Sequence, residues 1–122
     1  MDRDNVIVRL TFDYALLIID YASELEELRK FVIADQVLKS GTSIGANVNE
    51  AQSAESRKDF IHKLKIADKE VKETKYWLSL CKYAKNYPFR DELLTKLDEI
   101  QRVLGKIIIT SIKKLNDEQA GK

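Results

Sequence analysis

The sequence predicts an all-α protein: one domain, residues 1–122, folded as an antiparallel four-helix bundle in up-down-up-down order. Apolar residues recur every three or four positions through four long segments, which is the period of helices buried on one side. Pro88 is the only proline and there are four glycines, so few positions interrupt a helix. Hydrophobic residues make up 44% of the chain, enough for one core.

The first helix is expected over residues 5–28, and it is apolar on two sides. One face carries Val6, Leu10, Tyr14, Leu17, Tyr21, Leu25 and Leu28. A second side carries Val8, Phe12, Ala15, Ile19 and Ala22. A helix that is apolar around most of its circumference must be buried on more than one side. In a chain of this size, we expect the second side to contact another subunit.

The second helix is expected over residues 32–54 and contains the stretch "KSGTSIGANVNEAQ", residues 39–52. A phosphate-binding loop would need a preceding strand and a Gly-Lys-Ser/Thr sequence, and neither occurs. The core stripe also runs unbroken through the stretch, from Val37 to Val48. We therefore predict a helix. Gly41 and Gly45 each cost about 1 kcal/mol relative to alanine, and their small size would allow another helix to approach closely.

Polar residues flank the apolar stripe of this second helix. They are Gln36, Ser40, Ser43, Asn47 and Glu50. The sequence leaves two interpretations open: a solvated face, or a hydrogen-bonded seam buried between helices or subunits.

The third helix is expected over residues 56–85 and the fourth over residues 90–115, followed by a frayed polar tail, residues 116–122. Ser56 can cap the third helix because Asp59 follows three residues later. Its core stripe is Phe60, Leu64, Ala67, Val71, Thr74, Leu78 and Cys81. The stripe of the fourth helix is Leu93, Leu97, Ile100, Leu104, Ile107 or Ile108, Ile112 and Leu115.

The charge is unevenly distributed. The net charge is +1, yet residues 56–88 hold nine bases and four acids. On the third helix, opposite its core stripe, lie Lys58, His62, Lys65, Lys69, Lys72, Tyr76 and Tyr83, and Arg102 and Lys106 of the fourth helix could extend this patch. Lysines spaced along a helix can neutralise phosphates, and tyrosines can stack on unpaired bases. The alternative is an ordinary solvated lysine-rich face.

The sequence offers little chemistry for an enzyme. Glu70 and Glu73 could form an acid–base or metal pair, but the di-iron bundle pattern needs Glu-x-x-His and the chain has one histidine, His62. No Gly-x-Ser-x-Gly motif occurs. Cys81, the only cysteine, lies on a core stripe. We expect a non-enzymatic protein with no cofactor or bound metal, in which Glu70 and Glu73 bond to Ser43, Asn47 or Lys63, within the chain or across an interface, and Trp77 is a packing anchor.

The N-terminus, "MDRDN", is acidic and lacks the basic region of a signal peptide. The apolar run from Tyr14 to Ile19 is far too short to span a bilayer. We expect a cytoplasmic protein that does not contact a membrane.

The stretch "SGTSIGANVNEAQSAESRKDFIHKLKIADKEVKETKYWL", Ser40 to Leu78, resembles the signature of the bacterial 23S rRNA intervening-sequence proteins. The first and fourth helices match that family only in length and pattern. The resemblance implies a small bundle that assembles as a ring-shaped homopentamer. A related protein is the accessory subunit of diversity-generating retroelements, which binds a reverse transcriptase and nucleic acid through a basic surface. The resemblance implies no enzymatic activity.

Two functions are therefore expected. The first is binding of nucleic acid, structured RNA above all, through Lys58, His62, Lys65, Lys69, Lys72, Tyr76, Arg102 and Lys106. The alternative is a scaffold that docks a partner protein on an oligomeric ring. For oligomer or helix packing we expect Ser40, Gly41, Ser43, Gly45, Asn47, Glu50, Glu70, Glu73 and Trp77 to matter.

Overall fold

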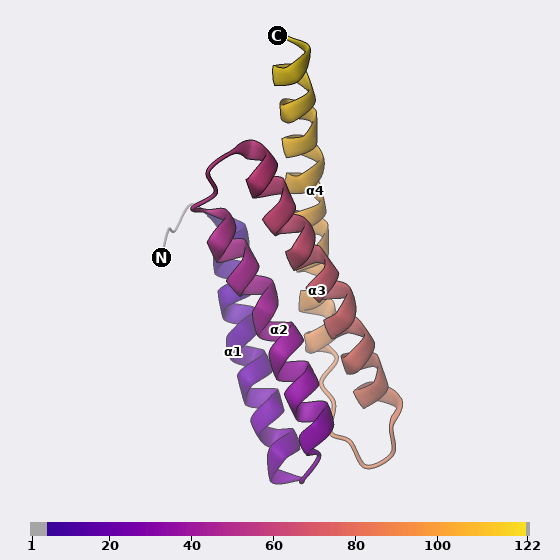
Figure 1. The fold of residues 1–122 in the computed structure, drawn as a ribbon. Helices are drawn as coiled ribbons and strands as arrows, with labels where there is room; N and C mark the ends of the chain where they lie inside the picture. The colour runs from indigo at the N-terminus through magenta and orange to yellow at the C-terminus, as the bar shows by residue number, and fades with distance from the viewer. Residues whose placement is uncertain (1–4, 122) are drawn as a thin grey trace.

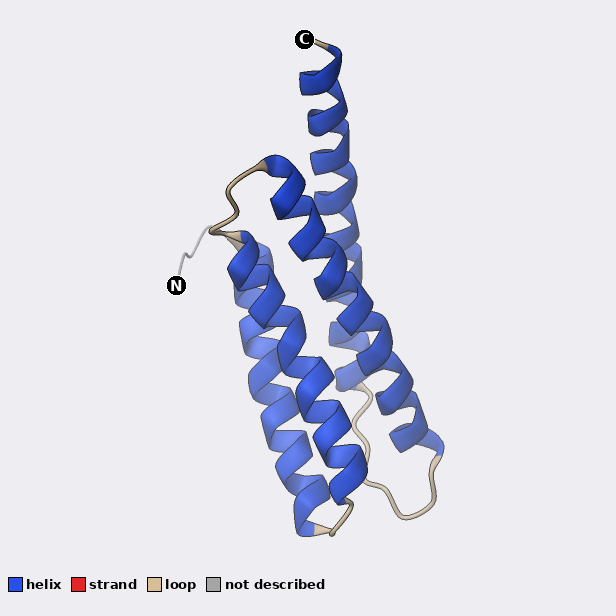
Figure 2. Cartoon of the chain, viewed as in Figure 1, coloured by secondary structure: helices blue, strands red, loops and turns tan. Residues whose placement is uncertain are grey.

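A computed structural model describes residues 5–121, which form four helices and no strands (Figure 2). In chain order the helices are α1 (Val6–Glu27), α2 (Phe31–Ala51), α3 (Arg57–Tyr83) and α4 (Glu92–Ala120) (Figure 1). The prediction of an all-α protein with four helices is confirmed. The acidic opening, residues 1–4, and residue 122 lie outside the described residues.

The helices pack around one core, with α2 against α1 and α3, and α4 against α3 and α1 (Figure 1). The α1–α2 and α3–α4 connections lie at the lower end of the view, and the α2–α3 connection lies at the upper end. The C-terminal part of α4 extends beyond the other three helices at that upper end.

The buried side of α1 differs in part from the predicted face. Tyr14, Tyr21 and Leu25 are buried as expected, but Val6 and Leu28 are 46% and 51% exposed. The other buried positions of α1 are Ile7, Thr11, Ile18 and Ala22. Thr11, the polar member of that set, is tolerated because its hydroxyl donates to the Ile7 carbonyl at 2.8 Å and is therefore not left unbonded.

Two tyrosines of α1 fix the position of α4. The Tyr14 hydroxyl donates to the carbonyl of Leu93, in the first turn of α4, at 2.7 Å. The Tyr21 hydroxyl donates to the carbonyl of Pro88 at 2.7 Å and so holds the α3–α4 connection. Both side chains are buried, so each bond satisfies a hydroxyl that would otherwise be costly to bury.

The glycines of α2 allow close contact with α1. A Cβ atom on Gly41 would lie 2.8 Å from Cγ2 of Ile18, and one on Gly45 would lie 3.2 Å from the carbonyl oxygen of Thr11. Residues 39–51, where a phosphate-binding loop is the alternative to a helix, lie within α2, so the helix prediction is confirmed. The neighbour that its small residues admit is α1 of the same chain.

The predicted end of α2 is wrong. The helix stops at Ala51 rather than Ala54 because residues 52–54 form tight turns, in which each N–H donates to the carbonyl three residues earlier. Ser56 then starts α3 by accepting a bond from the Asp59 N–H at 3.0 Å, as its capping motif predicts.

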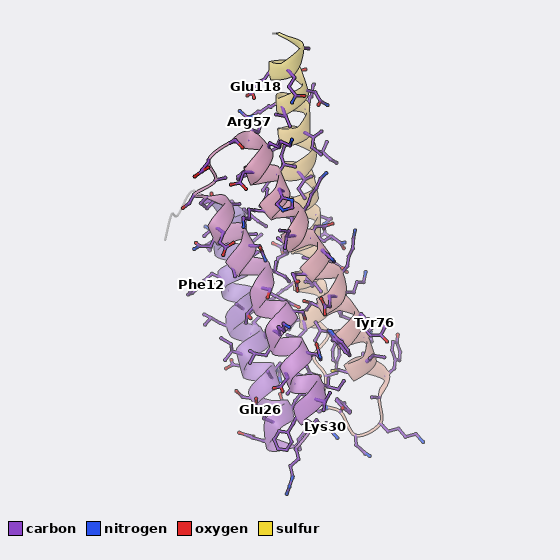
Figure 3. The ribbon with its side chains drawn as sticks, viewed as in Figure 1. Phe12, Glu26, Lys30, Arg57, Tyr76 and Glu118 are labelled. Carbon is purple, nitrogen blue, oxygen red and sulfur yellow. The ribbon has the colours of Figure 1, made fainter. Side chains whose placement is uncertain are left out.

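The predicted frayed tail, residues 116–122, is also wrong, because α4 remains helical to Ala120. Arg57, in the first turn of α3, pairs with Glu118 of α4 at 2.8 Å (Figure 3). This pair holds the last turns of α4 beside α3. Within residues 5–121, no helix is long and apolar enough to span a membrane.

Candidate nucleic-acid interface

The residues predicted to bind nucleic acid follow the solvent-facing side of α3. We call the following residues the α3 stripe: Lys58, His62, Lys65, Lys69, Lys72, Tyr76 and Tyr83. All of them are exposed, and they lie opposite the buried side of the helix. From Lys58 to Lys72 the helix rises by about 21 Å, a length along which a nucleic-acid backbone presents several phosphates.

Most cations of the α3 stripe have no acidic partner. Among the described residues, no carboxylate lies within salt-bridge distance of Lys58, Lys65 or Lys69. Lys72 differs, because it pairs with Asp68 at 3.3 Å. An exposed ion pair of this kind contributes little free energy, so a phosphate can replace the carboxylate at small cost.

The two cations predicted on α4 lie near α3. Arg102 and Lys106 are both exposed. Asp98, one turn before Arg102, pairs with Lys75 of α3 at 3.7 Å, which places this side of α4 at the α3–α4 boundary. Lys106 lines a groove of about 400 Å³ together with Arg57 of α3. Both cations can therefore contribute to the field beside the α3 stripe.

A groove at the C-terminal end of α3 is not evident from the sequence. Its volume is about 540 Å³, and it lies between α2, α3 and the α3–α4 connection. We call it the tyrosine groove, after Tyr76, Tyr83 and Tyr87, which line it with Ile33 and Leu80. The helical period places the first two tyrosines on one side of α3. The other members come from separate segments, so no local pattern could have joined them.

The polar seam of α2 is bonded mainly to its own helix. Ser40, Ser43 and Asn47 each donate to a backbone carbonyl four residues earlier. Glu50 reaches α3, where its carboxylate pairs with Lys63 at 3.2 Å. Of the two interpretations left open by the sequence, neither holds along the whole seam: Ser40 is buried, whereas Glu50 is exposed.

Within the described chain, Glu70 and Glu73 do not form the bonds predicted for them. Among the described residues, neither carboxylate bonds to Ser43 or Asn47, and Lys63 pairs with a different acid. The short side chains of α2 are already satisfied by carbonyls of their own helix, so they have no need to reach across.

The environment of Glu70 favours its neutral form. Burial raises the pKa of this carboxyl above its ordinary value, and the neighbouring Glu73 raises it further, against the opposing effect of Lys69 and Lys39. Trp77 packs against the core, as predicted for an anchor, and its Nε1 is buried with no hydrogen-bond partner among the described residues.

The outward side of α1 is apolar and uncovered. We call the following residues the α1 outer face: Val8, Phe12, Ala15, Leu16 and Ile19. Phe12 and Leu16 are 49% and 50% exposed. Between this face and α2 lies a groove of about 410 Å³, to which α2 contributes only small or short side chains. Phe12 projects from the opposite side of the molecule to Tyr76 (Figure 3).

The described residues show no arrangement typical of a metal centre. Within residues 5–121, no three His, Cys, Asp or Glu side chains are grouped so that they could hold a metal ion. Cys81 is buried, as its place on the core stripe predicts, and burial raises the pKa of its thiol.

Comparisons with other proteins agree with the resemblance of Ser40–Leu78. The sequence model of a family described as 23S rRNA-intervening sequence protein matches residues 3–106. A crystal structure of a protein of unknown function from the S23 ribosomal protein family of Bacteroides thetaiotaomicron is 41% identical, with a TM-score of 0.77. That match covers 84% of this chain and 98% of the other. Comparison with curated proteins finds no match.

Proposed function

Because this chain belongs to the 23S rRNA-intervening sequence protein family, we propose that it is a cytoplasmic, non-enzymatic protein that binds structured RNA through the α3 stripe. The observation that carries the proposal is the row of exposed lysines on α3, of which Lys58, Lys65 and Lys69 have no acidic partner among the described residues. Cations without partners gain most when a phosphate arrives, because no existing pair has to be broken.

RNA, rather than another polyanion, is favoured by the family description and by the name of the similar structure, which refer to rRNA and to a ribosomal protein family. The rigidity of the site also supports binding. The α3 stripe lies on a helix of 27 residues that packs against both α2 and α4, so the backbone positions from which its cations project are fixed. A rigid backbone loses less conformational freedom on binding than a flexible segment does.

The proposal is tested by reversing two charges of the stripe. We expect Lys65→Glu/Lys69→Glu to weaken binding of a labelled hairpin RNA at least about tenfold at low salt, because two phosphate contacts become repulsive. The slope of log affinity against log salt should also fall, by about 0.7 for each lost contact with a single strand. Fluorescence anisotropy over a salt series measures both quantities.

The matched control is Arg29→Glu/Lys96→Glu, which makes the same change in net charge at exposed basic residues in the α1–α2 connection and on α4. It should bind RNA nearly as well as the unaltered protein. Equal losses in the two double variants would show that only overall charge matters and would remove the α3 stripe from the proposal.

We also propose that the protein assembles through the α1 outer face, in the ring-shaped homopentamer that the family resemblance implies. Support comes from the half-exposed Phe12 and Leu16, since contiguous exposed apolar side chains are typical of interaction sites. The up-down-up-down order that we propose for the bundle is supported by connections at alternate ends (Figure 1). Because Phe12 and Tyr76 face opposite ways, assembly through α1 would leave the α3 stripe accessible (Figure 3).

Assembly is tested by sedimentation velocity. We expect Phe12→Glu/Ile19→Glu to sediment as a smaller species than the unaltered protein, because two charges cannot be buried in an apolar contact. The control is Ile109→Glu, a charge on an exposed apolar residue of α4 outside the matched residues 3–106. If the control dissociates the protein and the α1 variant does not, the interface lies elsewhere.

The second candidate function is a scaffold for a protein partner. The α1 outer face favours it as an alternative to assembly, because an apolar surface can bind a different chain in place of a second copy. Recovery of one protein, after nuclease treatment, by the unaltered chain but not by Phe12→Glu/Ile19→Glu would support the scaffold over RNA binding.

A further inference from the structure

The tyrosine groove lies where the α3 stripe ends. Tyr76 and Tyr83 belong to both, and they are 59% and 80% exposed. Lys72 precedes Tyr76 by one helical turn and Lys69 by two, so the cations lead directly to the groove. A ligand held by these lysines would therefore reach the tyrosines without changing direction. A volume of about 540 Å³ is in the range of small-ligand pockets.

The rings of the groove are unusually exposed for aromatic side chains. Tyr83 extends from the last turn of α3, and no hydrogen bond of its hydroxyl occurs among the described residues. Leu80 between the two tyrosines is 41% exposed. Flat apolar surface of this kind is suited to stacking against another ring.

The charges around the groove exclude one class of ligand. The Nζ atom of Lys30 lies 4.4 Å from the centre of the Tyr87 ring, and that of Lys82 lies 5.8 Å from the centre of the Tyr83 ring. Aromatic cages bind quaternary ammonium groups, but here lysines of the same chain already occupy ring faces. A cationic ligand would be repelled, whereas a ring that carries a phosphate would be attracted.

We infer that the tyrosine groove holds an unpaired base of the RNA whose phosphates bind along the α3 stripe. This inference rests on the proposed function and names the class of RNA: a hairpin loop or a junction between duplex and single strand, rather than continuous duplex. A base within a duplex is stacked on its neighbours and cannot enter the groove, whereas an unpaired base presents both faces.

The groove should be tolerant of base identity. Its lining is mainly aliphatic and aromatic, with the Ser79 hydroxyl, the Cys81 thiol and the tyrosine hydroxyls as its side-chain polar groups. Stacking depends on the faces of a base and not on its hydrogen-bonding edges, so all four bases can bind. Discrimination is therefore expected between unpaired and paired nucleotides, not between sequences.

The experiment uses a hairpin RNA with 2-aminopurine in its loop, and the same strand annealed to its complement. The unaltered protein should quench the loop fluorophore and bind the hairpin more tightly than the duplex. Tyr76→Ala/Tyr83→Ala should weaken hairpin binding by roughly tenfold or more, abolish the quenching and lower duplex affinity far less, because the lysines that contact the phosphates are retained. Tyr76→Phe/Tyr83→Phe, which keeps both rings, should behave as the unaltered protein.

A second variant changes the groove without removing either tyrosine. Leu80→Glu places a carboxylate in the groove while both tyrosines stay in place, and it should weaken hairpin binding more than duplex binding, because the new charge repels the phosphate of a nucleotide in the groove. Because Leu80 is partly exposed, this change leaves the core intact.

The same variants distinguish an error in this inference about the groove from an absence of RNA binding. If Lys65→Glu/Lys69→Glu loses hairpin binding but the alanine variant keeps affinity and quenching, the RNA binds along the stripe and the groove is not involved. If the alanine variant instead changes sedimentation with no effect on RNA, the groove belongs to a protein contact. If the unaltered protein binds neither RNA, this inference and the proposed function are both overturned.

Discussion

Gly41→Ala is expected to destabilise the protein, and to stabilise it once Ile18 has been replaced by alanine. The added methyl group would lie 2.8 Å and 2.9 Å from the Cγ2 and Cγ1 atoms of Ile18, whose side chain is fully buried. Overpacking of this kind costs about 1–3 kcal/mol, and the gain in helix propensity is about 1 kcal/mol. The net effect is a loss of free energy of unfolding, up to about 2 kcal/mol.

The reversal comes from removing the atoms that clash. Ile18→Ala alone should cost about 2–5 kcal/mol, since it leaves a cavity in the core. In that background Gly41→Ala no longer meets either Cγ atom, and only the Cβ atom of residue 18, at 3.3 Å, still lies close. Part of the helix-propensity gain of about 1 kcal/mol should therefore appear. The difference between the two backgrounds is the coupling between the residues. Urea unfolding followed by circular dichroism measures it, at one fixed protein concentration because assembly affects the midpoint.

Gly105→Ala is the matched control. Gly105 lies within α4, and apart from its two chain neighbours and the backbone of its own helix, no atom of the described residues lies within 4 Å of an added Cβ. It should stabilise the protein by about 1 kcal/mol. If Gly41→Ala stabilised the protein as much as Gly105→Ala does, the close approach of α1 and α2 would be contradicted.

The second prediction concerns alkaline pH, at which the protein should unfold with a steep dependence on pH. Burial raises the pKa of the hydroxyls of Tyr14 and Tyr21 well above the usual range. Below about pH 10 both groups are neutral in the folded and unfolded states and contribute nothing. Above that pH only the unfolded state loses the protons, so the free energy of unfolding falls as pH rises.

Each buried tyrosine can contribute a slope of about 1.4 kcal/mol per pH unit, and the two together about 2.7 kcal/mol per pH unit. The Cys81 thiol, whose pKa is also raised by burial, should begin to act lower, from about pH 8.5. Denaturant unfolding at a series of pH values from about 8 to 12 measures the slope.

Tyr14→Phe separates the effect of tyrosine ionisation on stability from the effect of the hydrogen bond. At neutral pH this variant should lose about 1 kcal/mol, because the bond to the Leu93 carbonyl is gone. Above about pH 10 its stability should fall less steeply, by one proton. Tyr83→Phe removes an exposed hydroxyl and should leave the slope unchanged. Equal slopes in all three proteins would show that the buried tyrosines do not control alkaline unfolding.

Helical periodicity was a sufficient guide to α3. Its predicted core stripe is buried from Leu64 to Cys81, and the lysines opposite are exposed. The first predicted member, Phe60, is only partly buried, and its neighbour Ile61 is buried instead. The same reasoning was less accurate for α1, because that helix is apolar on several sides and periodicity alone cannot say which side faces the core. Thr11 illustrates the difficulty. Its side chain can be buried because its hydroxyl donates to a carbonyl of the same helix, and the sequence alone does not show that this bond forms.

Contacts across helices were predicted less well than positions along them. The sequence suggested that Glu70 or Glu73 would bond to Lys63, but the lysine pairs with Glu50 of α2. Many acids lie within a few helical turns of any base in a chain this charged, and the choice among them depends on how two helices are offset. The tyrosine groove was missed for the same reason, since Ile33 and Tyr87 are distant in sequence.

The order of apolar and polar residues was enough to establish four helices, the helical state of the glycine-containing stretch and the exposed row of lysines on α3. These features depend on interactions within about four residues, which a sequence records directly. The rotation of α1 toward the core, the pairing of Lys63 with Glu50 and the groove at the end of the stripe required the assembled bundle. They depend on which surfaces pack most densely against each other, and that is a property of all four helices together.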